Sequence, residues 1–121
     1  MKFYLIIKAI LFICLFSSGL LNAAEKDINE KWCIANGGIT EYRTKDGTYV
    51  DCLTDTYAIE VEYDYNWKES IGQTLHYAET TGKQPAILFI KRKLSKKDYL
   101  QELKRTVVEF KLPIKLFVIN E

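Results

Sequence analysis

Three acidic side chains on two neighbouring predicted strands have the types and spacing most able to do chemistry. Asp51 lies on a strand predicted over 48–53, and Glu60 and Glu62 lie on the next, predicted over 56–63. Because successive strand side chains point to opposite faces, Glu60 and Glu62 share a face, roughly 6–7 Å apart. Carboxylates gathered on one face repel one another unless a cation lies between them. This spacing therefore predicts a site for a divalent cation.

The turn between these strands decides whether Asp51 lies beside the other carboxylates. With a two-residue loop at 54–55, Asp51 pairs with Ala58, shares the face of Glu62 and becomes a diagonal neighbour of Glu60. A three-residue loop would turn one strand over and break this pattern. The same register sends four apolar residues to the opposite face, as a packed core requires: Val50, Cys52, Ile59 and Val61. The hydrophobic pattern therefore favours the register that assembles the acidic site.

The ligands determine what chemistry such a site could support. Hard carboxylate oxygens from Asp51 and Glu60, with Glu62 assisting, favour Mg²⁺ or Mn²⁺, which keep several waters for a phosphate-bearing substrate. The next predicted helix carries Lys68 and Gln73, which could orient the attacking water and the substrate. The open alternative is that Glu60 and Glu62 form the solvated face of an ordinary amphipathic strand.

The arrangement resembles the PD-(D/E)XK nuclease superfamily. Its core is a helix, three strands, a helix and a strand, with an Asp on one strand and a Glu-x-Lys on the next. Asp51 fits the Asp, Glu60 the Glu, and Gln73 the helical Gln found in Holliday-junction resolvases. Glu30 fits the acid that many members carry on the first helix. The resemblance covers residues 25–90 and implies a restriction-endonuclease-like fold, a Mg²⁺ or Mn²⁺ cofactor and nuclease activity.

The chain departs from the pattern of that family at one position. Glu62 stands two residues after Glu60, where the family has its Lys. Some members carry this Lys on the helix, so the resemblance implies that Lys68 takes its part. A chain whose Lys68 does not reach the site would bind metal or nucleic acid without cutting it.

Residues 1–23 have the pattern of a secretory signal peptide, with Lys2 near the start, an apolar run and small residues at 23–24. Cleavage would leave one domain over 24–121 and reduce the 17 basic residues to 15, against 16 acidic ones. We therefore expect an exported, periplasmic or secreted protein with no stable membrane insertion after cleavage. An uncleaved anchor is the competing interpretation, although the uninterrupted apolar run over 9–21 is short for a membrane span.

Two cysteines, Cys33 and Cys52, belong to the predicted mature domain. An even pair in a small exported domain predicts a disulfide. Closing a loop of about 20 residues would stabilise the fold by roughly 3 kcal/mol. A thiolate metal site is the alternative, but it needs more soft ligands than the single histidine, His76, provides.

The periodicity of the rest of the chain predicts an α/β domain. Helices are predicted over 25–35, 67–80 and 95–110, the last capped by Ser95. Strands are predicted over 39–44, 48–53, 56–63, 85–90 and 112–120, with a hairpin turn at Asp46-Gly47. The order αβββαβαβ indicates an antiparallel meander followed by two crossover units. We therefore expect a mixed β-sheet with flanking helices.

Basic residues crowd the join between the fourth strand and the last helix: Lys91, Arg92, Lys93, Lys96 and Lys97. Such clusters contact phosphates, so nucleic acid is the expected partner, although basic runs are also common on solvated surfaces. The sequence has no phosphate-cradling glycine loop, dinucleotide fingerprint, serine nucleophile motif or zinc-ligand spacing. The leading hypothesis is an exported metal-dependent nuclease-like protein. The alternative is a non-catalytic exported binding module constrained by the disulfide.

Overall fold

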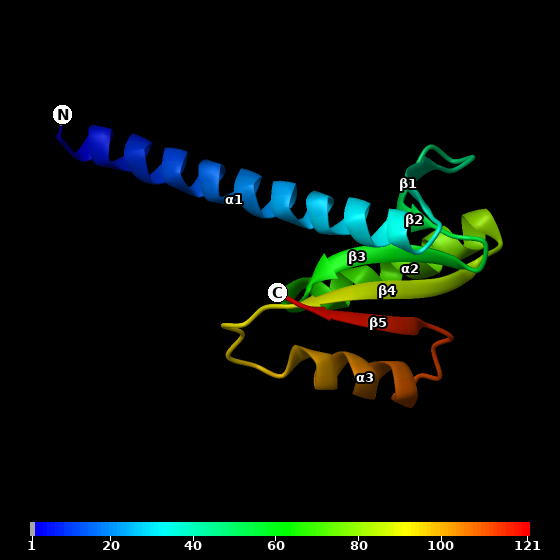
Figure 1. Cartoon of the computed structure of the whole chain (residues 1–121). Coiled ribbons are helices and arrows are strands. Elements are labelled where there is room, and N and C mark those ends of the chain that lie inside the picture. Colours follow the sequence, from blue (N-terminus) through cyan, green and yellow to red (C-terminus); the bar gives the residue numbers. More distant parts are fainter. Residues whose placement is uncertain (1) are drawn as a thin grey trace.

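A five-stranded mixed sheet forms the centre of the domain (Figure 1). The computed structural model describes residues 2–121, with side chains at all of these positions except 3–5, 8–9 and 11–18. The strands are β1 (Ile39–Arg43), β2 (Tyr49–Leu53), β3 (Tyr57–Tyr63), β4 (Gln84–Lys91) and β5 (Lys115–Asn120), and they lie side by side in sequence order. The first three are antiparallel, and β3, β4 and β5 are parallel. The predicted αβββαβαβ order and the mixed α/β sheet are confirmed.

The helices cover both faces of this sheet. On one face lies α1 (Lys2–Ala35), and on the other lie α2 (Trp67–Thr81) and α3 (Tyr99–Glu109) (Figure 1). A short 3-10 helix, η1 (Asp64–Asn66), joins β3 directly to α2. The apolar run of β4 supplies both cores: Ala86, Leu88 and Ile90 pack on the α1 side, while Ile87 and Phe89 pack under α2 and α3. Burial on both faces explains why β4 has no polar alternation.

The first helix ends as predicted at Ala35, where Gly37 adopts a positive φ of 73° and the chain turns back. Its helical backbone begins at Lys2 and continues through the predicted cleavage position. Many side chains of the predicted signal sequence, including Lys8, lie outside the described residues. No helix within the described part of the chain is both long and apolar enough to cross a membrane. Cleavage and export therefore stay predictions.

The predicted disulfide is present between Cys33 on α1 and Cys52 on β2, with their Cα atoms 5.7 Å apart. Both cysteines are fully buried. Gly38 packs against the bond, because an added Cβ at this position would lie 2.6 Å from each sulfur. The disulfide therefore fixes the end of α1 against the sheet at the strand that carries Asp51.

The turn between β2 and β3 differs from the prediction. Leu53 pairs with Ala58, and Cys52 pairs with Ile59, so four residues rather than two form the loop. The hydroxyl of Thr54 accepts hydrogen bonds from the backbone N–H groups of Thr56 and Tyr57 at 3.2 and 2.9 Å, which stabilises this wider turn. A shift of two residues turns neither strand over, so Cys52, Ile59 and Val61 stay together on their predicted face. Continued by one residue past Cys52, this register brings Asp51 level with Glu60 instead of diagonal to it.

Two local predictions are wrong. Val50 does not share the face of Cys52: it packs with Ala58 and Tyr77 on the α2 side, because β2 twists away from β3 beyond Cys52. The last helix begins at Tyr99 and not near Ser95. Its N-cap is Asp98, whose side chain accepts a hydrogen bond from the N–H of Gln101 at 3.1 Å, while the Ser95 hydroxyl bonds to Asp64.

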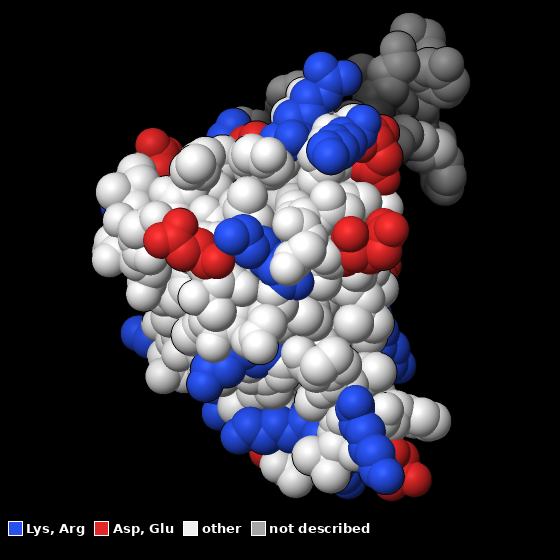
Figure 2. Space-filling view, turned by 90° about the vertical axis from the view of Figure 1, so that its right-hand side faces the viewer, with Lys and Arg blue, Asp and Glu red and all other residues white. Residues whose placement is uncertain are grey.

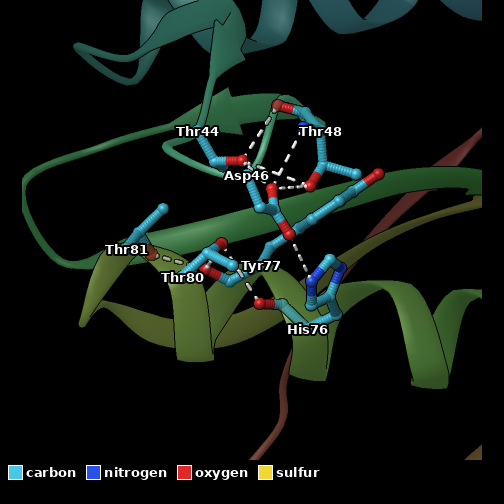
Figure 3. A network of polar contacts seen from close by, with 7 residues as sticks. All are labelled: Thr44, Asp46, Thr48, His76, Tyr77, Thr80 and Thr81. Atoms are coloured by element: carbon cyan, nitrogen blue, oxygen red, sulfur yellow. Dashed lines mark hydrogen bonds and ion pairs between the residues drawn. The ribbon is translucent and has the colours of Figure 1, made fainter.

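The tip of the β1–β2 hairpin is tied to α2 by a polar network (Figure 3). Asp46 accepts hydrogen bonds from Thr44 and Thr48, and its second oxygen lies 2.8 Å from Nε2 of His76. These bonds, the one with Thr44 foremost, hold the pKa of Asp46 below its usual value. On the next position of α2, the Tyr77 carbonyl accepts a hydrogen bond from Thr81 at 2.7 Å. The hairpin therefore has a fixed position against the helix that faces the acidic strands.

Candidate functional site

Asp51 and Glu60 form a carboxyl pair where β2 separates from β3. The ladder between the strands is paired at Cys52 and Ile59. At the next position the Asp51 carboxylate accepts a hydrogen bond from the backbone N–H of Val61 at 2.8 Å. Glu60 is 4% exposed, and after burial the charge of the neighbouring Asp51 is the next cause that raises its pKa. The pair is therefore built into the sheet and is not a solvated surface feature.

A third and a fourth carboxyl group adjoin this pair. Glu25 on α1 and Glu62, the next outward carboxyl group on β3, are close enough for each to affect the pKa of the other. Glu62 accepts a hydrogen bond from the backbone N–H of Tyr63 at 3.0 Å and another from the side-chain amide of Asn66 at 3.4 Å. The structure therefore brings together the three predicted acids and adds one that was not predicted.

Burial and mutual repulsion raise the pKa of all four groups. Burial is the first cause for Glu60, and the charge of Asp51 is the second. Burial is also the first cause for Asp51 and Glu62. For Glu25, burial and then Glu62 raise the pKa to about 8. Without a cation, the cluster therefore holds protons at neutral pH that isolated carboxyl groups would release.

A cavity of about 200 Å³ opens between α1 and the three antiparallel strands beside this pair. Its lining comprises Asn22, Glu25, Lys26, Asn29, Glu41, Asp51 and Val61. Asn29 is 4% exposed; its amide nitrogen donates to the Asp51 carbonyl at 2.9 Å. Its Oδ1 and the Oε2 of Glu60 are buried, and neither has a hydrogen-bond donor among the described residues. Two buried acceptor oxygens thus adjoin the acidic pair without a partner.

Two further features shape the cavity. Glu41 lies opposite Asp51 in the β1–β2 register and has a positive φ of 52°, a strained conformation for a residue with a side chain. On the α2 side, Tyr77 is buried beside Glu60, and burial followed by that carboxyl group raises the pKa of the phenol. Tyr77 therefore covers the acidic pair on the side of α2.

The two predicted helical partners lie elsewhere. Lys68 is exposed, and its ammonium lies 5.7 Å from the ring centre of Trp67, which packs in the core between α2 and α3. Gln73 is also exposed. No described ion pair joins Lys68 to the acidic cluster. The lysine that lines the cavity is Lys26 on α1.

The predicted acid of the first helix, Glu30, is exposed, whereas Glu25 and Asn29 face the site. Glu25, Asn29 and Cys33 are spaced four residues apart, so they share one stripe of α1. Because the disulfide joins Cys33 to the neighbour of Asp51, this stripe must face the acidic strand. The signal for Glu25 and Asn29 in the sequence is their position eight and four residues before Cys33 of the predicted disulfide.

No group of three or more His, Cys, Asp or Glu side chains in the described part of the chain has a geometry ready to hold a metal ion. The pKa values of the four carboxyl groups are raised, so a cation would compete with protons for them.

The basic residues between β4 and α3 divide into one fixed and four exposed side chains. Lys91, Lys93, Lys96 and Lys97 are exposed. Arg92 instead pairs with Asp64, which is 1% exposed, at 2.7 Å. Burial tends to raise the pKa of Asp64, but its hydrogen bonds with Ser95 and Arg92 outweigh burial, and the net shift is downward. Other Lys and Arg side chains gather over the lower part of the face in Figure 2, where α3 carries the exposed Lys104 and Arg105.

The sequence is similar to two KilA-N domain-containing proteins of Acanthamoeba polyphaga mimivirus. One is 30% identical over 96 residues, which cover 79% of this chain and 26% of the relative. The other is 41% identical over 54 residues, which cover 45% of this chain and 22% of the relative. The chain therefore spans about a quarter of the length of the relatives that it matches. No family model and no solved structure matches the sequence.

Proposed function

We propose that the acidic cavity binds a divalent cation and that the protein acts on nucleic-acid phosphodiesters as a metal-dependent, nuclease-like enzyme. The observation that carries this proposal is the cavity lined by Glu25, Glu41 and Asp51, beside which Oδ1 of Asn29 is buried without a donor among the described residues. Buried polar atoms are normally hydrogen-bonded, so an unsatisfied one needs an explanation. A cation in the cavity would offer Oδ1 of Asn29 a partner and reduce the repulsion among the carboxyl groups.

The donor set selects the class of cation. Asp51, Glu60 and Asn29 offer only oxygen, which suits Mg²⁺ or Mn²⁺ rather than zinc or copper. When bound, such an ion lowers the pKa of a coordinated water and neutralises charge on a phosphate. Lys26 lines the cavity at its α1 side and is placed to orient a phosphate oxygen. We therefore assign to Lys26 the part that the sequence suggested for Lys68.

Nucleic acid is the substrate class that the remaining features favour. The exposed lysines between β4 and α3 offer phosphate contacts on the same chain as the acidic cavity. The relatives are named for a KilA-N domain, which favours a partner of this class. The arrangement of Asp51 and Glu60 on adjacent strands before α2 is the restriction-endonuclease-like feature of this proposal. Export to the periplasm or medium belongs to the same proposal, on the strength of the signal pattern over 1–23 and the Cys33–Cys52 bond.

One observation favours a non-catalytic binding module on the same scaffold. The carboxyl groups form no ready-made metal site among the described residues, and both Lys68 and Gln73 are exposed. In that case Asp51 and Glu60 would be a destabilising pair with no ion to bind. The two candidates therefore differ in how the fold responds to metal.

Thermal unfolding of the purified, disulfide-intact protein with Mg²⁺ or Mn²⁺ tests the proposal. We expect the midpoint to rise with metal concentration, because a ligand that binds only the folded state adds about 2.7 kcal/mol at a hundred times its Kd. Asp51→Asn should abolish the rise while the protein stays folded, since Asn can still accept from Val61. Asp55→Asn, an exposed acid on the β2–β3 turn, is the matched control and should respond like the wild type.

Metal-dependent cleavage of labelled single- and double-stranded DNA and RNA would then identify the substrate. A wild-type midpoint that does not move at millimolar metal would rule out the cation site and with it the nuclease proposal. A metal-dependent rise without cleavage of any of the four substrates would keep the cation site and overturn the nuclease activity.

A further inference from the structure

Arg92 differs from its basic neighbours because its guanidinium plane is fixed. Its Nε donates to Oδ1 of the buried Asp64 at 2.7 Å, and its backbone N–H donates to the other oxygen at 3.4 Å. The guanidinium carbon lies 4.2 Å from the ring centre of Tyr65, which stacks in turn on Tyr63 at 6.1 Å with an interplanar angle of 9°. An arginine held in this way loses little side-chain entropy when it binds a ligand.

The outer edge of this guanidinium is available. Among the described residues, no side chain accepts a hydrogen bond from either terminal nitrogen of Arg92. The side chain is 35% exposed. Two parallel N–H groups on a planar fork match the oxygens of a phosphate, which a lysine can bind only as a point charge.

A cavity of about 540 Å³ adjoins Arg92, lined also by Lys93, Leu94 and Glu121. It lies beyond the carboxyl ends of β4 and β5, the edge at which parallel α/β sheets bind ligands. The hydroxyl of Tyr63, which is 1% exposed and lies within electrostatic reach of Glu121 and Arg92, has no hydrogen-bond partner among the described residues. The cavity itself therefore offers the fixed cation, while the unsatisfied Tyr63 hydroxyl lies outside its lining.

The same cavity is near the acidic cluster. Tyr65 belongs to η1, which directly follows β3, and the Asn66 amide of that helix donates to Glu62 at 3.4 Å. Burial raises the pKa of Tyr65 and the charge of Glu62 adds to the increase, whereas Arg92 opposes it. The ring of Tyr65 thus lies within electrostatic range of both the acidic cluster and Arg92.

We propose that Arg92 is a fixed anchor for a backbone phosphate of the bound nucleic-acid strand, next to the phosphate at the acidic cavity. This inference rests on the proposed function for the identity of the strand. The chemistry that it requires, a phosphate oxygen pair on the Arg92 fork, is shared by a free phosphate ion. Asp64 and Tyr65 act as positioning residues that hold the fork in place.

The test is the affinity of the full chain for a fluorescein-labelled 15-nucleotide single-stranded DNA, measured by anisotropy in EDTA so that metal plays no part. Arg92→Lys keeps the charge but removes the fork, and we expect about a tenfold loss of affinity. Lys96→Gln is the control from the same loop; loss of one mobile phosphate contact should cost two- to threefold and reduce the salt dependence by about one ion.

Tyr65→Leu removes the ring under the guanidinium and leaves the bond to Asp64 in place, so it tests positioning even if Arg92→Lys folds poorly. We expect its affinity to fall by at least threefold, with thermal unfolding confirming that it is folded at the temperature of the assay. Folded Arg92→Lys and Tyr65→Leu proteins that bind like the wild type would overturn the anchor and leave the proposed function intact.

Inorganic phosphate separates the anchor from the nucleic-acid assignment. If the wild type does not bind the oligonucleotide but phosphate raises its midpoint, and this effect is lost in Arg92→Lys, the anchor stands and the nucleic-acid proposal fails. If neither the oligonucleotide nor millimolar phosphate binds, the anchor is wrong.

Discussion

Two buried carboxyl groups that are close in the sequence, Glu60 within β3 and Asp64 just after it, have opposite electrostatics. Asp64, just after the strand, is 1% exposed and receives hydrogen bonds from Arg92 and Ser95. Glu60, within the strand, is 4% exposed, yet its neighbours are Asp51 and further acids. The pKa of Asp64 is lowered, whereas that of Glu60 is raised. Asp64 has a cationic partner in Arg92. Among the described residues, no ion pair includes Asp51 or Glu60.

This difference indicates what each site is for. Burying an unpaired charge costs far more than burying a paired one, and a fold that only needed stability would have paired both. Perturbed pKa values that arise from burial together with like charges are typical of functional sites. We therefore infer that Asp64 is a structural residue that positions Arg92. We propose that the partner of the Asp51–Glu60 pair comes from outside the chain.

The largest expected effect comes from removing the disulfide that holds α1 over the acidic pair. Cys33→Ser with Cys52→Ser should lower the free energy of unfolding by about 3 kcal/mol in denaturant titrations. The acidic region should respond more than the Asp64 region, because only the former depends on Glu25 and Asn29 of α1.

Hydrogen exchange distinguishes the two regions. In the double variant we expect faster exchange for β1 and β2, while the β4–α3 join should change little. Equal acceleration in both regions would contradict the separation of the two sites.

The next largest effect is expected at Asp64. Asp64→Ala removes the acceptor for Arg92 and Ser95, and the loss of these charge-assisted hydrogen bonds should lower stability by about 2 kcal/mol. Arg92 is part-exposed and can be hydrated again, which keeps the loss moderate. The control Asp55→Ala, on an exposed turn, should change stability by less than about 0.5 kcal/mol. If Asp64→Ala does not change the free energy of unfolding, this carboxylate contributes no more to stability than the acidic pair does.

The fold was accessible from the sequence because its signals are local. The alternation in β3, the unbroken apolar run of β4 and the glycine that ends α2 each depend on a few adjacent residues. The β2–β3 register was wrong by two residues, because the bonds that Thr54 makes within the turn had no signature as strong as an Asp-Gly pair. The predicted faces of Cys52, Ile59 and Val61 stayed correct, since two residues is one full strand period, whereas that of Val50 did not.

The site was accessible only in part. Asp51 and Glu60 followed from strand alternation, which is a property of the backbone. The approach of Glu25 and Asn29 depends on how α1 docks, which is a tertiary property that the disulfide alone could have revealed. Helical spacing did not predict correctly where Lys68 and Gln73 lie. The buried Trp67, Thr74 and Tyr77 determine which face of α2 packs on the sheet. The packing of these side chains therefore fixes the orientation of the helix, whatever a single polar side chain could reach.

The smallest expected effect concerns protonation of the acidic pair without metal. Because burial and then Asp51 raise the pKa of Glu60, the folded state binds more protons than the unfolded state above about pH 4, where free carboxyl groups ionise. Stability in EDTA should therefore fall as the pH rises from 5 to about 8, the value to which the pKa of Glu25 is raised. Glu60→Gln should gain about 1 kcal/mol at pH 7.5 and show a shallower pH slope.

Saturating Mn²⁺ should flatten or reverse the wild-type slope, since a cation at Asp51 and Glu60 competes with protons for them. Asp64→Asn, in contrast, should leave the slope between pH 5 and 8 unchanged, because a carboxyl group with a lowered pKa is ionised in both states across that range. A wild-type slope that Glu60→Gln does not alter would mean that the carboxyl pair is not the group that binds the extra protons.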